Sequence, residues 1–488
     1  MKKFQLALLT GLVTAMTGSM AQAAATNETA DVITYLSGST AAGAAITNAV
    51  KAVCDPATFE TYIDATSKGG DYKTWFCRSK GVTGLNDGTK IMVRLTGASK
   101  IIGDNVFVNP VGGSMLGVVP IAYKQKLAFL AVSPATAQAC SGDPLSSTGA
   151  TCTDNTPGLL TPSIPQFGLS DLYPSAFIGQ NAPAATGAIG SDAIAKLKVS
   201  PSTMVIFAAP ITKGLRDKLQ DVQFAAGKLD PACTSPSTNR ELGVCTPSLT
   251  GDQLAKVFSG QATKWNEVDP GLEAKNVRVV RRDIGSGTQA TLNLVGMSAQ
   301  YKTPSNAYPC IGGANPEILN LSHVQVVSTS GAMVTALNKA ETDGEWAIGV
   351  LDAGRIGNGK DVAPIATAGF RYPKIDGFAP TMVNVAAGKY VYIGQVTVNR
   401  REPWDGTPQE KAVVDAVTAA LNDPTIVAKG NTSSALKHNF GDSGYMVVGA
   451  TSCTTEATCA TNPVTAYRFA ANPADAPTGY CNAPKAVW

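Results

Sequence analysis

Residues 277–288 constrain the fold of this chain more than any other stretch. Residues 277–280, which include three valines, predict a short buried strand. Two arginines follow, and a Gly-Ser-Gly-Thr turn at 285–288 precedes apolar residues at helical spacing. The start of a helix leaves backbone N–H groups unpaired and carries partial positive charge, so it attracts an oxyanion. The simpler alternative is an ordinary Ser/Thr-capped helix beside a surface arginine. The candidate anion contacts are Arg282, Ser286, Gly287 and Thr288.

Two further turns of small polar residues follow apolar segments earlier in the chain. Residues 31–36 predict a strand that leads into Gly38-Ser39-Thr40, and residues 91–95 predict one that leads into Gly97-Ala98-Ser99. Residues 167–170 predict a third strand end, which delivers a carboxylate; a helix N-cap is the alternative role for that carboxylate. A single small polar turn after a strand usually binds nothing. This chain has three such turns, at 38–40, 97–99 and 285–288, which together favour a binding role. These segments add Thr40, Ser99 and Asp171 to the candidates.

Predicted strands alternate with predicted helices along the chain, which indicates an α/β architecture with mostly parallel sheets. Two helix starts are marked by capping boxes, at Thr250–Gln253 and at Thr407–Glu410, the second with proline at the first helical position. In sheets of this kind ligands bind beyond the carboxyl ends of the strands, where the small polar turns lie.

The chain has 488 residues, more than one hydrophobic core holds, and so predicts two domains. A strand that runs into Pro210 and another at 346–351 are suited to carry the chain between them. We expect lobe 1 at 24–206 and 349–488, with an insertion at about 104–165, and lobe 2 at 207–348. The last part of lobe 1, residues 431–488, is expected to be a loop-like extension that contains three cysteines.

The N-terminus has the pattern of an export signal. Lys2 and Lys3 precede a largely apolar stretch, and Ala21-Gln22-Ala23 fits a cleavage site, so residues 1–23 are the predicted signal peptide. No cysteine follows that site, so a lipid anchor is not indicated. No later stretch is apolar over the roughly 18 residues that a membrane span needs. We therefore expect the protein in a periplasm or outside the cell, without a membrane span after cleavage.

The chain has ten cysteines, an even number that suits an oxidising compartment. Four pairs are close in sequence, and the remaining two cysteines then form a long-range pair. The predicted disulfides are Cys54–Cys77, Cys140–Cys152, Cys233–Cys245, Cys453–Cys459 and Cys310–Cys481. The chain has no C-x-x-C motif, so no metal site and no cofactor are expected. The formal charge of +3 falls to 3 − 2 = +1 without Lys2 and Lys3, which argues against a nucleic-acid partner.

Several of these segments together resemble the phosphate-binding periplasmic proteins of ABC transporters, within the type II periplasmic-binding-protein fold. The resemblance rests on residues 38–40, 167–171, 249–268 and 279–288. It leaves 104–165 and 431–488 uncovered. It implies an α/β protein of two lobes that close on one dehydrated phosphate, with an ABC permease as partner.

The resemblance also implies roles for single residues. Thr40 and the backbone N–H of Ala41 contact the anion from lobe 1, and Ser99 adds a donor. Asp171 accepts a hydrogen bond from the protonated oxygen of phosphate, which sulfate lacks. The contacts from lobe 2 are Arg282, Ser286, Gly287 and Thr288.

Two positions depart from the family pattern. Ile284 stands where the family usually has an Asp that pairs with the arginine, so Arg282 is expected to be held less firmly. Ala41 stands where the family often has an aromatic residue, which removes packing over the anion. Both departures bear on the affinity and identity of the anion more than on the fold.

The leading hypothesis is a binding protein for phosphate or a similar oxyanion. The alternative is a secreted or cell-surface scaffold or adhesin of the same fold, which the extra length and the disulfides favour. An enzyme is not expected. Gly441-Asp442-Ser443-Gly444 near His438 is similar to the nucleophile motif of trypsin-like proteases, but a nucleophile also needs an oriented base. A phosphate-ester hydrolase on the same fold is the other enzymatic alternative.

Overall fold

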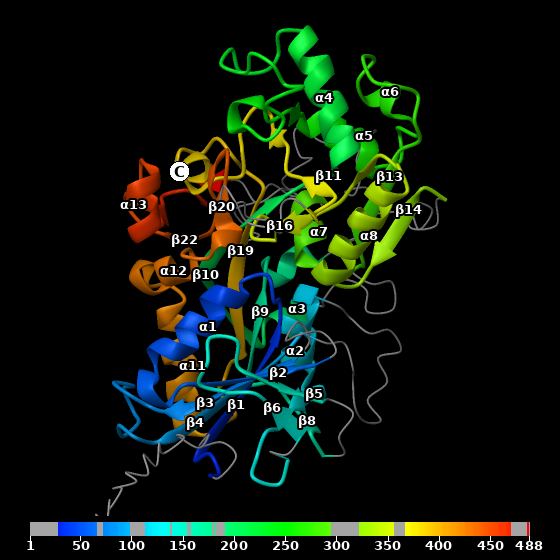
Figure 1. Cartoon of the computed structure of the whole chain (residues 1–488). Coiled ribbons are helices and arrows are strands. Elements are labelled where there is room, and N and C mark those ends of the chain that lie inside the picture. The colour runs from blue at the N-terminus through cyan, green and yellow to red at the C-terminus, as the bar shows by residue number, and fades with distance from the viewer. Residues whose placement is uncertain are drawn as a thin grey trace, which may run out of the picture.

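The computed structural model describes residues 28–65, 72–97, 113–136, 139–153, 158–177, 181, 191–293, 322–355, 367–469 and 486–487. The predicted signal peptide, Ser99, Cys310 and Cys481 lie outside these residues. Figure 1 shows the arrangement, with α4, α5 and α6 at the opposite end of the molecule from β3 and β4.

The largest sheet among the described residues is mixed and has twelve strands. The strands in spatial order are β23 (Val464–Thr465), β22 (Tyr445–Val448), β10 (Leu197–Ala208), β19 (Ile393–Arg401), β9 (Phe167–Ser170), β1 (Val32–Gly38), β4 (Lys90–Thr96), β3 (Tyr72–Arg78), β2 (Glu60–Asp64), β7 (Ala150–Cys152) and β6 (Cys140–Ser141), with β16 (Leu351–Asp352) beside β10.

A smaller sheet of five strands forms the second unit among the described residues. Its order is β14 (Val324–Val327), β13 (Arg278–Arg282), β15 (Ala347–Ile348), β11 (Ile211–Thr212) and β17 (Phe370–Arg371). Four two-stranded pairs complete the described strands. They are β12 (Ser248–Leu249) with β18 (Lys374–Ile375), β20 (Lys437–His438) with β21 (Gly441–Asp442), β5 (Leu127–Leu130) with β8 (Leu160–Ser163), and β24 (Arg468–Phe469) with β25 (Ala486–Val487).

The expectation of mostly parallel sheets is wrong for the larger sheet. β1 is parallel to β4 and β9, as the strand–helix alternation predicts. However, β2–β3–β4 is an antiparallel meander, and the long strands β10 and β19 are antiparallel over most of their length. Antiparallel neighbours need only short connections, whereas a parallel pair needs a crossover of a dozen or more residues. The short links within residues 60–96 therefore select antiparallel pairing.

Helices cover both sheets and bury apolar faces against them. α1 contacts α11 and α12 beside the larger sheet, and α8 contacts β13 and β15 of the smaller sheet. The α-helices are α1 (Gly43–Ala52), α2 (Val119–Tyr123), α3 (Ser191–Ile194), α4 (Lys213–Ala225), α5 (Gly251–Phe258), α6 (Trp265–Val268), α7 (Gly287–Thr291), α8 (Ser330–Thr342), α10 (Met382–Ala386), α11 (Pro408–Ala420), α12 (Pro424–Gly430) and α13 (Glu456–Thr461). None of the helices in the described ranges is long and apolar enough to cross a membrane.

The chain crosses between the sheets at two places that the sequence indicated. β10 ends at Ala208 in the larger sheet, and β11 begins just after Pro210 in the smaller one. β15 and β16 carry the chain back at Gly349–Val350, where the Gly349 N–H donates to the Pro210 carbonyl. The pairing of β17 with β11 adds a later segment to the smaller sheet, for which short strands gave no sequence signal. The lobe boundaries themselves stay a prediction.

The four local disulfides are confirmed: Cys54–Cys77, Cys140–Cys152, Cys233–Cys245 and Cys453–Cys459. Each closes a loop within one unit, and Cys140–Cys152 links the paired strands β6 and β7. The predicted pair Cys310–Cys481 lies outside the described residues.

Both predicted capping boxes are present, and the one at α5 gives a stability prediction. The Thr250 hydroxyl accepts from the Gln253 N–H at 3.1 Å, and the Gln253 side chain accepts from the Thr250 N–H at 2.9 Å. We expect Thr250→Ala to lower the free energy of unfolding by about 1 kcal/mol, because a helix-start donor loses its partner. Lys256→Ala, on the same helix, should change it by less than about 0.5 kcal/mol. Denaturant unfolding of both variants measures the difference; equal losses would contradict it.

Candidate anion-binding site

The central predicted turn forms as the sequence indicates. β13 ends at Arg282, Gly285 adopts the left-handed conformation with φ +96°, and Ser286 is the N-cap of α7. The Ser286 hydroxyl oxygen accepts from the Gln289 N–H at 3.5 Å. A residue with a side chain is strained at such a φ, which explains the glycine at 285. The turn therefore presents the first backbone N–H groups of α7 at the end of β13.

Asp171 lies at the end of β9 and is 2% exposed. Its two carboxylate oxygens accept from different serines: Ser39 Oγ donates to Oδ1 at 2.5 Å, and Ser114 Oγ donates to Oδ2 at 2.9 Å. Burial raises the pKa of this carboxyl, while the two hydroxyl hydrogen bonds and the charge of Arg282 act in the opposite direction. Each carboxylate oxygen has a second lone-pair site, so the ionised group can still accept another hydrogen bond.

The turn at residues 285–288, which follows β13 of the smaller sheet, lies against the side chain of Asp171. A Cβ added at Gly287 would lie 2.2 Å from Ser114 Oγ and 2.7 Å from Asp171 Cβ, so only glycine fits there. Next to this contact the Met115 N–H donates to the Gly285 carbonyl at 3.2 Å. Segments that follow strands of two different sheets thus converge on Asp171.

Arg282 is 6% exposed, and its guanidinium is held by the turn that opens α8. Nη2 donates to the Ser328 carbonyl at 2.7 Å and Nη1 to Ser330 Oγ at 3.3 Å. Its Nε is buried and has no hydrogen-bond partner among the described residues. A guanidinium has five N–H donors, so donors of Arg282 remain available to an anion. Burial lowers its pKa, and the charges of Asp283 and Asp171 oppose that shift.

Asp283 forms a long ion pair with Arg282, with Oδ1 3.9 Å from Nε. Burial raises the pKa of Asp283 to about 6, although the charge of Arg282 acts to lower it. The 3.9 Å between Asp283 Oδ1 and Arg282 Nε is too long for a hydrogen bond. Where the resemblance implies an Asp partner at position 284, the structure instead holds the guanidinium through Ser328 and Ser330.

The other predicted contacts are placed less directly. Thr288 is buried, and its carbonyl accepts from the Tyr392 hydroxyl at 2.9 Å. Ala41 follows Ser39 in the β1–α1 turn, and its N–H donates to Ser39 Oγ at 3.2 Å. Thr40 is half-buried between them. Ser99 lies outside the described residues. The structure therefore brings Asp171 together with Gly287 and places Thr40 and Ala41 beside a serine that contacts Asp171.

Residues 222–414, less than half of the chain, match a family model described as a PBP superfamily domain. The matched segment includes the β13 turn and four of the predicted contacts, Arg282, Ser286, Gly287 and Thr288. The predicted α/β fold class is confirmed.

Solved structures with similarity to this chain include the following three. A candidate phosphate ABC transporter substrate-binding protein from Clostridium perfringens, with bound phosphate, is 15% identical and has a TM-score of 0.40, over 82% of this chain and 97% of that one. PstS from Borrelia burgdorferi is 12% identical with a TM-score of 0.34, over 79% and 92%. An ABC-type phosphate transport receptor from Vibrio cholerae is 16% identical with a TM-score of 0.29, over 52% and 74%. Comparison with curated proteins gives no match.

Three residues beside Asp171 and the turn at residues 285–288 were missed by sequence reasoning: Ser39, Ser114 and Tyr392. Ser39 lies in a turn that the sequence singled out, but Thr40, one residue later, was selected. Ser114 lies within the predicted insertion, although Gly113-Ser114 before an apolar run is another small polar turn and could have been noticed. Tyr392 gave no signal, because a tyrosine next to a strand is ordinary.

The protease alternative is not supported by the arrangement of its residues. His438 Nε2 lies 2.8 Å from the Ala353 carbonyl, and its ring stacks on Phe440. Ser443 Oγ is buried and has no hydrogen-bond partner among the described residues, so His438 does not act on it as a hydrogen-bonded base. Asp442 pairs with Lys437. The residues that the structure describes also contain no group of His, Cys, Asp or Glu that could hold a metal ion.

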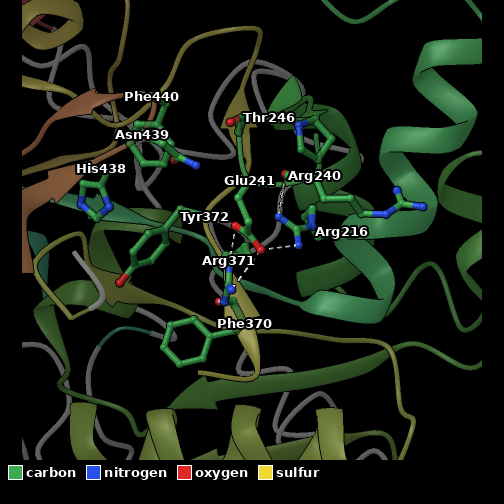
Figure 2. A pocket seen from close by; sticks show the side chains of 11 residues that line it. Arg216, Arg240, Glu241, Thr246, Phe370, Arg371, Tyr372, His438, Asn439 and Phe440 are labelled. Carbon is green, nitrogen blue, oxygen red and sulfur yellow. Dashed lines mark hydrogen bonds and ion pairs between the residues drawn. The ribbon is translucent and has the colours of Figure 1, made fainter. Parts of the chain in front are cut away.

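A pocket away from Asp171, shown in Figure 2, contains arginines but offers a poorer anion site. The carboxylate of Glu241 pairs with Arg216 at 2.9 Å and with Arg371 at 2.9 Å. Burial raises the pKa of Glu241 and the two guanidinium groups lower it, with a net value of about 2. Arg240 pairs with Asp221 at 2.9 Å, so each arginine that lines this pocket is already in an ion pair. Asp171 with the β13 turn is therefore the better candidate.

Proposed function

We propose that this protein is an exported solute-binding protein that captures inorganic phosphate between its two sheet-containing units. The observation that carries the proposal is the meeting of Asp171, a buried carboxylate, with Gly287 at the start of α7. Donors and one acceptor from separate segments are what a dehydrated, partly protonated oxyanion requires. The predicted contacts remain part of the proposal, and Ser114 joins them.

The chemistry of the candidate site favours phosphate over sulfate. Hydrogen phosphate carries a proton near neutral pH that an ionised Asp171 can accept in a hydrogen bond, whereas sulfate has no proton to offer. The remaining N–H groups of Arg282 and the first N–H groups of α7 supply donors to the other oxygens. Ligand binding then shifts the population towards the arrangement in which the two units are closed.

We extend the proposal to ABC-type uptake from a periplasm, with a membrane permease as the partner. The predicted signal peptide at 1–23 and the match of residues 222–414 to a PBP superfamily domain support this extension. Cell fractionation separates it from the adhesin alternative, because a location on the outer surface or in the medium would count against uptake. An assay with a chromogenic phosphate ester tests the hydrolase alternative, for which we expect no turnover.

Isothermal titration calorimetry of the mature chain tests the binding function. We expect phosphate and arsenate to bind with a Kd well below about 1 mM, and sulfate to bind at least about 100-fold more weakly. Sulfate is the matched control, since it has the same shape and charge as the phosphate dianion without its proton. The absence of phosphate binding at millimolar concentration would end the proposal.

A further inference from the structure

Two buried tyrosines precede β19, and each donates its phenol proton to a backbone carbonyl. Tyr390 Oη lies 2.7 Å from the Phe207 carbonyl, and Tyr392 Oη lies 2.9 Å from the Thr288 carbonyl. Both side chains are almost fully buried, at 2% and 0% exposure. Burial raises the pKa of both phenols well above the usual value, so both remain donors over the accessible pH range.

The two hydrogen bonds differ in what they join. Phe207 belongs to β10, the neighbour of β19 in the larger sheet, so the Tyr390 bond stays within that sheet. Thr288 belongs to α7, which follows β13 of the smaller sheet, so the Tyr392 bond joins the two units. The ring of Tyr392 is fixed against Phe207, with ring centroids 5.6 Å apart.

The Tyr392 phenol lies among the charged groups of the candidate site. The charges of Asp171 and Arg282 both act on its pKa, in opposite directions. Two residues further on, a Cβ added at Gly394 would lie 3.1 Å from the Asp171 carbonyl oxygen. The start of β19 therefore lies beside both parts of the candidate site. Gly394 lies next to Asp171, which follows β9, and Tyr392 is hydrogen-bonded to Thr288 at the start of α7.

We propose that Tyr392 is a positioning residue that holds the residue 285–288 turn opposite Asp171. α7 has only five residues, too few to be stable without tertiary contacts, so its orientation depends on what holds it. The phenol adds a second donor to the Thr288 carbonyl, which also accepts from the Leu292 N–H. For its effect on phosphate, this inference rests on the function proposed above.

The pair Tyr392→Phe and Tyr390→Phe tests the proposal, because each variant loses one buried phenol hydrogen bond and keeps its ring. The first measurement is hydrogen–deuterium exchange of the ligand-free proteins. We expect the amides of residues 286–292 to exchange about tenfold faster in Tyr392→Phe than in wild type, and to be unchanged in Tyr390→Phe. Equal exchange in the two variants overturns the proposal without reference to any ligand.

The second measurement is phosphate affinity by calorimetry, together with the dissociation rate. We expect Tyr392→Phe to bind phosphate about five- to tenfold more weakly, mainly through faster dissociation, and Tyr390→Phe to stay within about twofold of wild type. Equal affinities of the two variants overturn the positioning role in binding. If exchange changes as expected while wild type binds no phosphate, the contact between the units stands and the proposed function fails.

Discussion

Gly287→Ala is expected to abolish phosphate binding at micromolar concentration. The added methyl group would lie 2.2 Å from Ser114 Oγ and 2.7 Å from Asp171 Cβ, far inside van der Waals contact. The strain can be relieved only by moving the turn of the smaller sheet away from Asp171, because the crowded atoms belong to segments of two different units. We expect the affinity for phosphate to fall at least about 100-fold, measured by calorimetry.

The same substitution should alter the shape of the protein more than its folding. Small-angle scattering with saturating phosphate should show a larger radius of gyration for Gly287→Ala than for wild type, since the closed arrangement is blocked. Gly43→Ala is the matched control: Gly43 is also the first residue of a helix, and an added Cβ meets nothing within 4 Å. Unchanged phosphate affinity in Gly287→Ala would show that the observed contact does not form part of the binding arrangement.

The sequence predicted the parts of the site that depend on local structure. A strand, a left-handed glycine and a Ser N-cap are encoded within residues 277–288, and the capping boxes at Thr250 and Thr407 lie within four residues each. Asp171 was predicted in the same way, as a carboxylate at a strand end. These features were predictable because each is determined by neighbours in the sequence.

The parts that were missed depend on contacts between distant segments. Ser114 and Asp171 are 57 residues apart, and Tyr392 and Thr288 are 104 apart. In the β1–α1 turn, the choice between the hydroxyls of Ser39 and Thr40 depends on which one faces β9. The antiparallel pairing of β10 with β19 likewise joins segments that are almost 200 residues apart. No local pattern determines these pairings.

Asp171→Asn is expected to remove most of the discrimination between phosphate and sulfate. An ionised carboxylate accepts a hydrogen bond from the protonated oxygen of hydrogen phosphate and repels sulfate. Two like charges about 4 Å apart near a protein surface repel each other by about 4 kcal/mol. The amide carries no charge and can donate as well as accept, so sulfate gains a favourable partner. We expect the ratio of phosphate to sulfate affinity to fall about 100-fold, mainly through tighter sulfate binding, with calorimetry as the measurement.

The pH dependence of the ratio of phosphate to sulfate affinity tests the same role of Asp171 independently. Burial raises the pKa of Asp171, so the carboxyl of the folded protein gains its proton at a higher pH than an exposed aspartate does. As the pH falls through that value, the group stops repelling sulfate and turns from acceptor to donor. The wild-type ratio should therefore decline towards that of Asp171→Asn as the pH is lowered. Comparing the two proteins at each pH removes the effect of phosphate protonation, because that effect is the same for both.

A buried aspartate elsewhere supplies the control for Asp171→Asn. Asp64 on β2 is fully buried and accepts from the Tyr72 N–H at 2.9 Å, remote from the turn at 285–288. Asp64→Asn removes one buried carboxylate without touching the candidate site, so we expect its ratio of phosphate to sulfate affinity to match wild type at every pH. Asp171→Asn could instead keep the wild-type ratio of phosphate to sulfate affinity and its pH dependence. In that case Asp171 accepts no hydrogen bond from the protonated oxygen of the ligand, and its two serine contacts are structural.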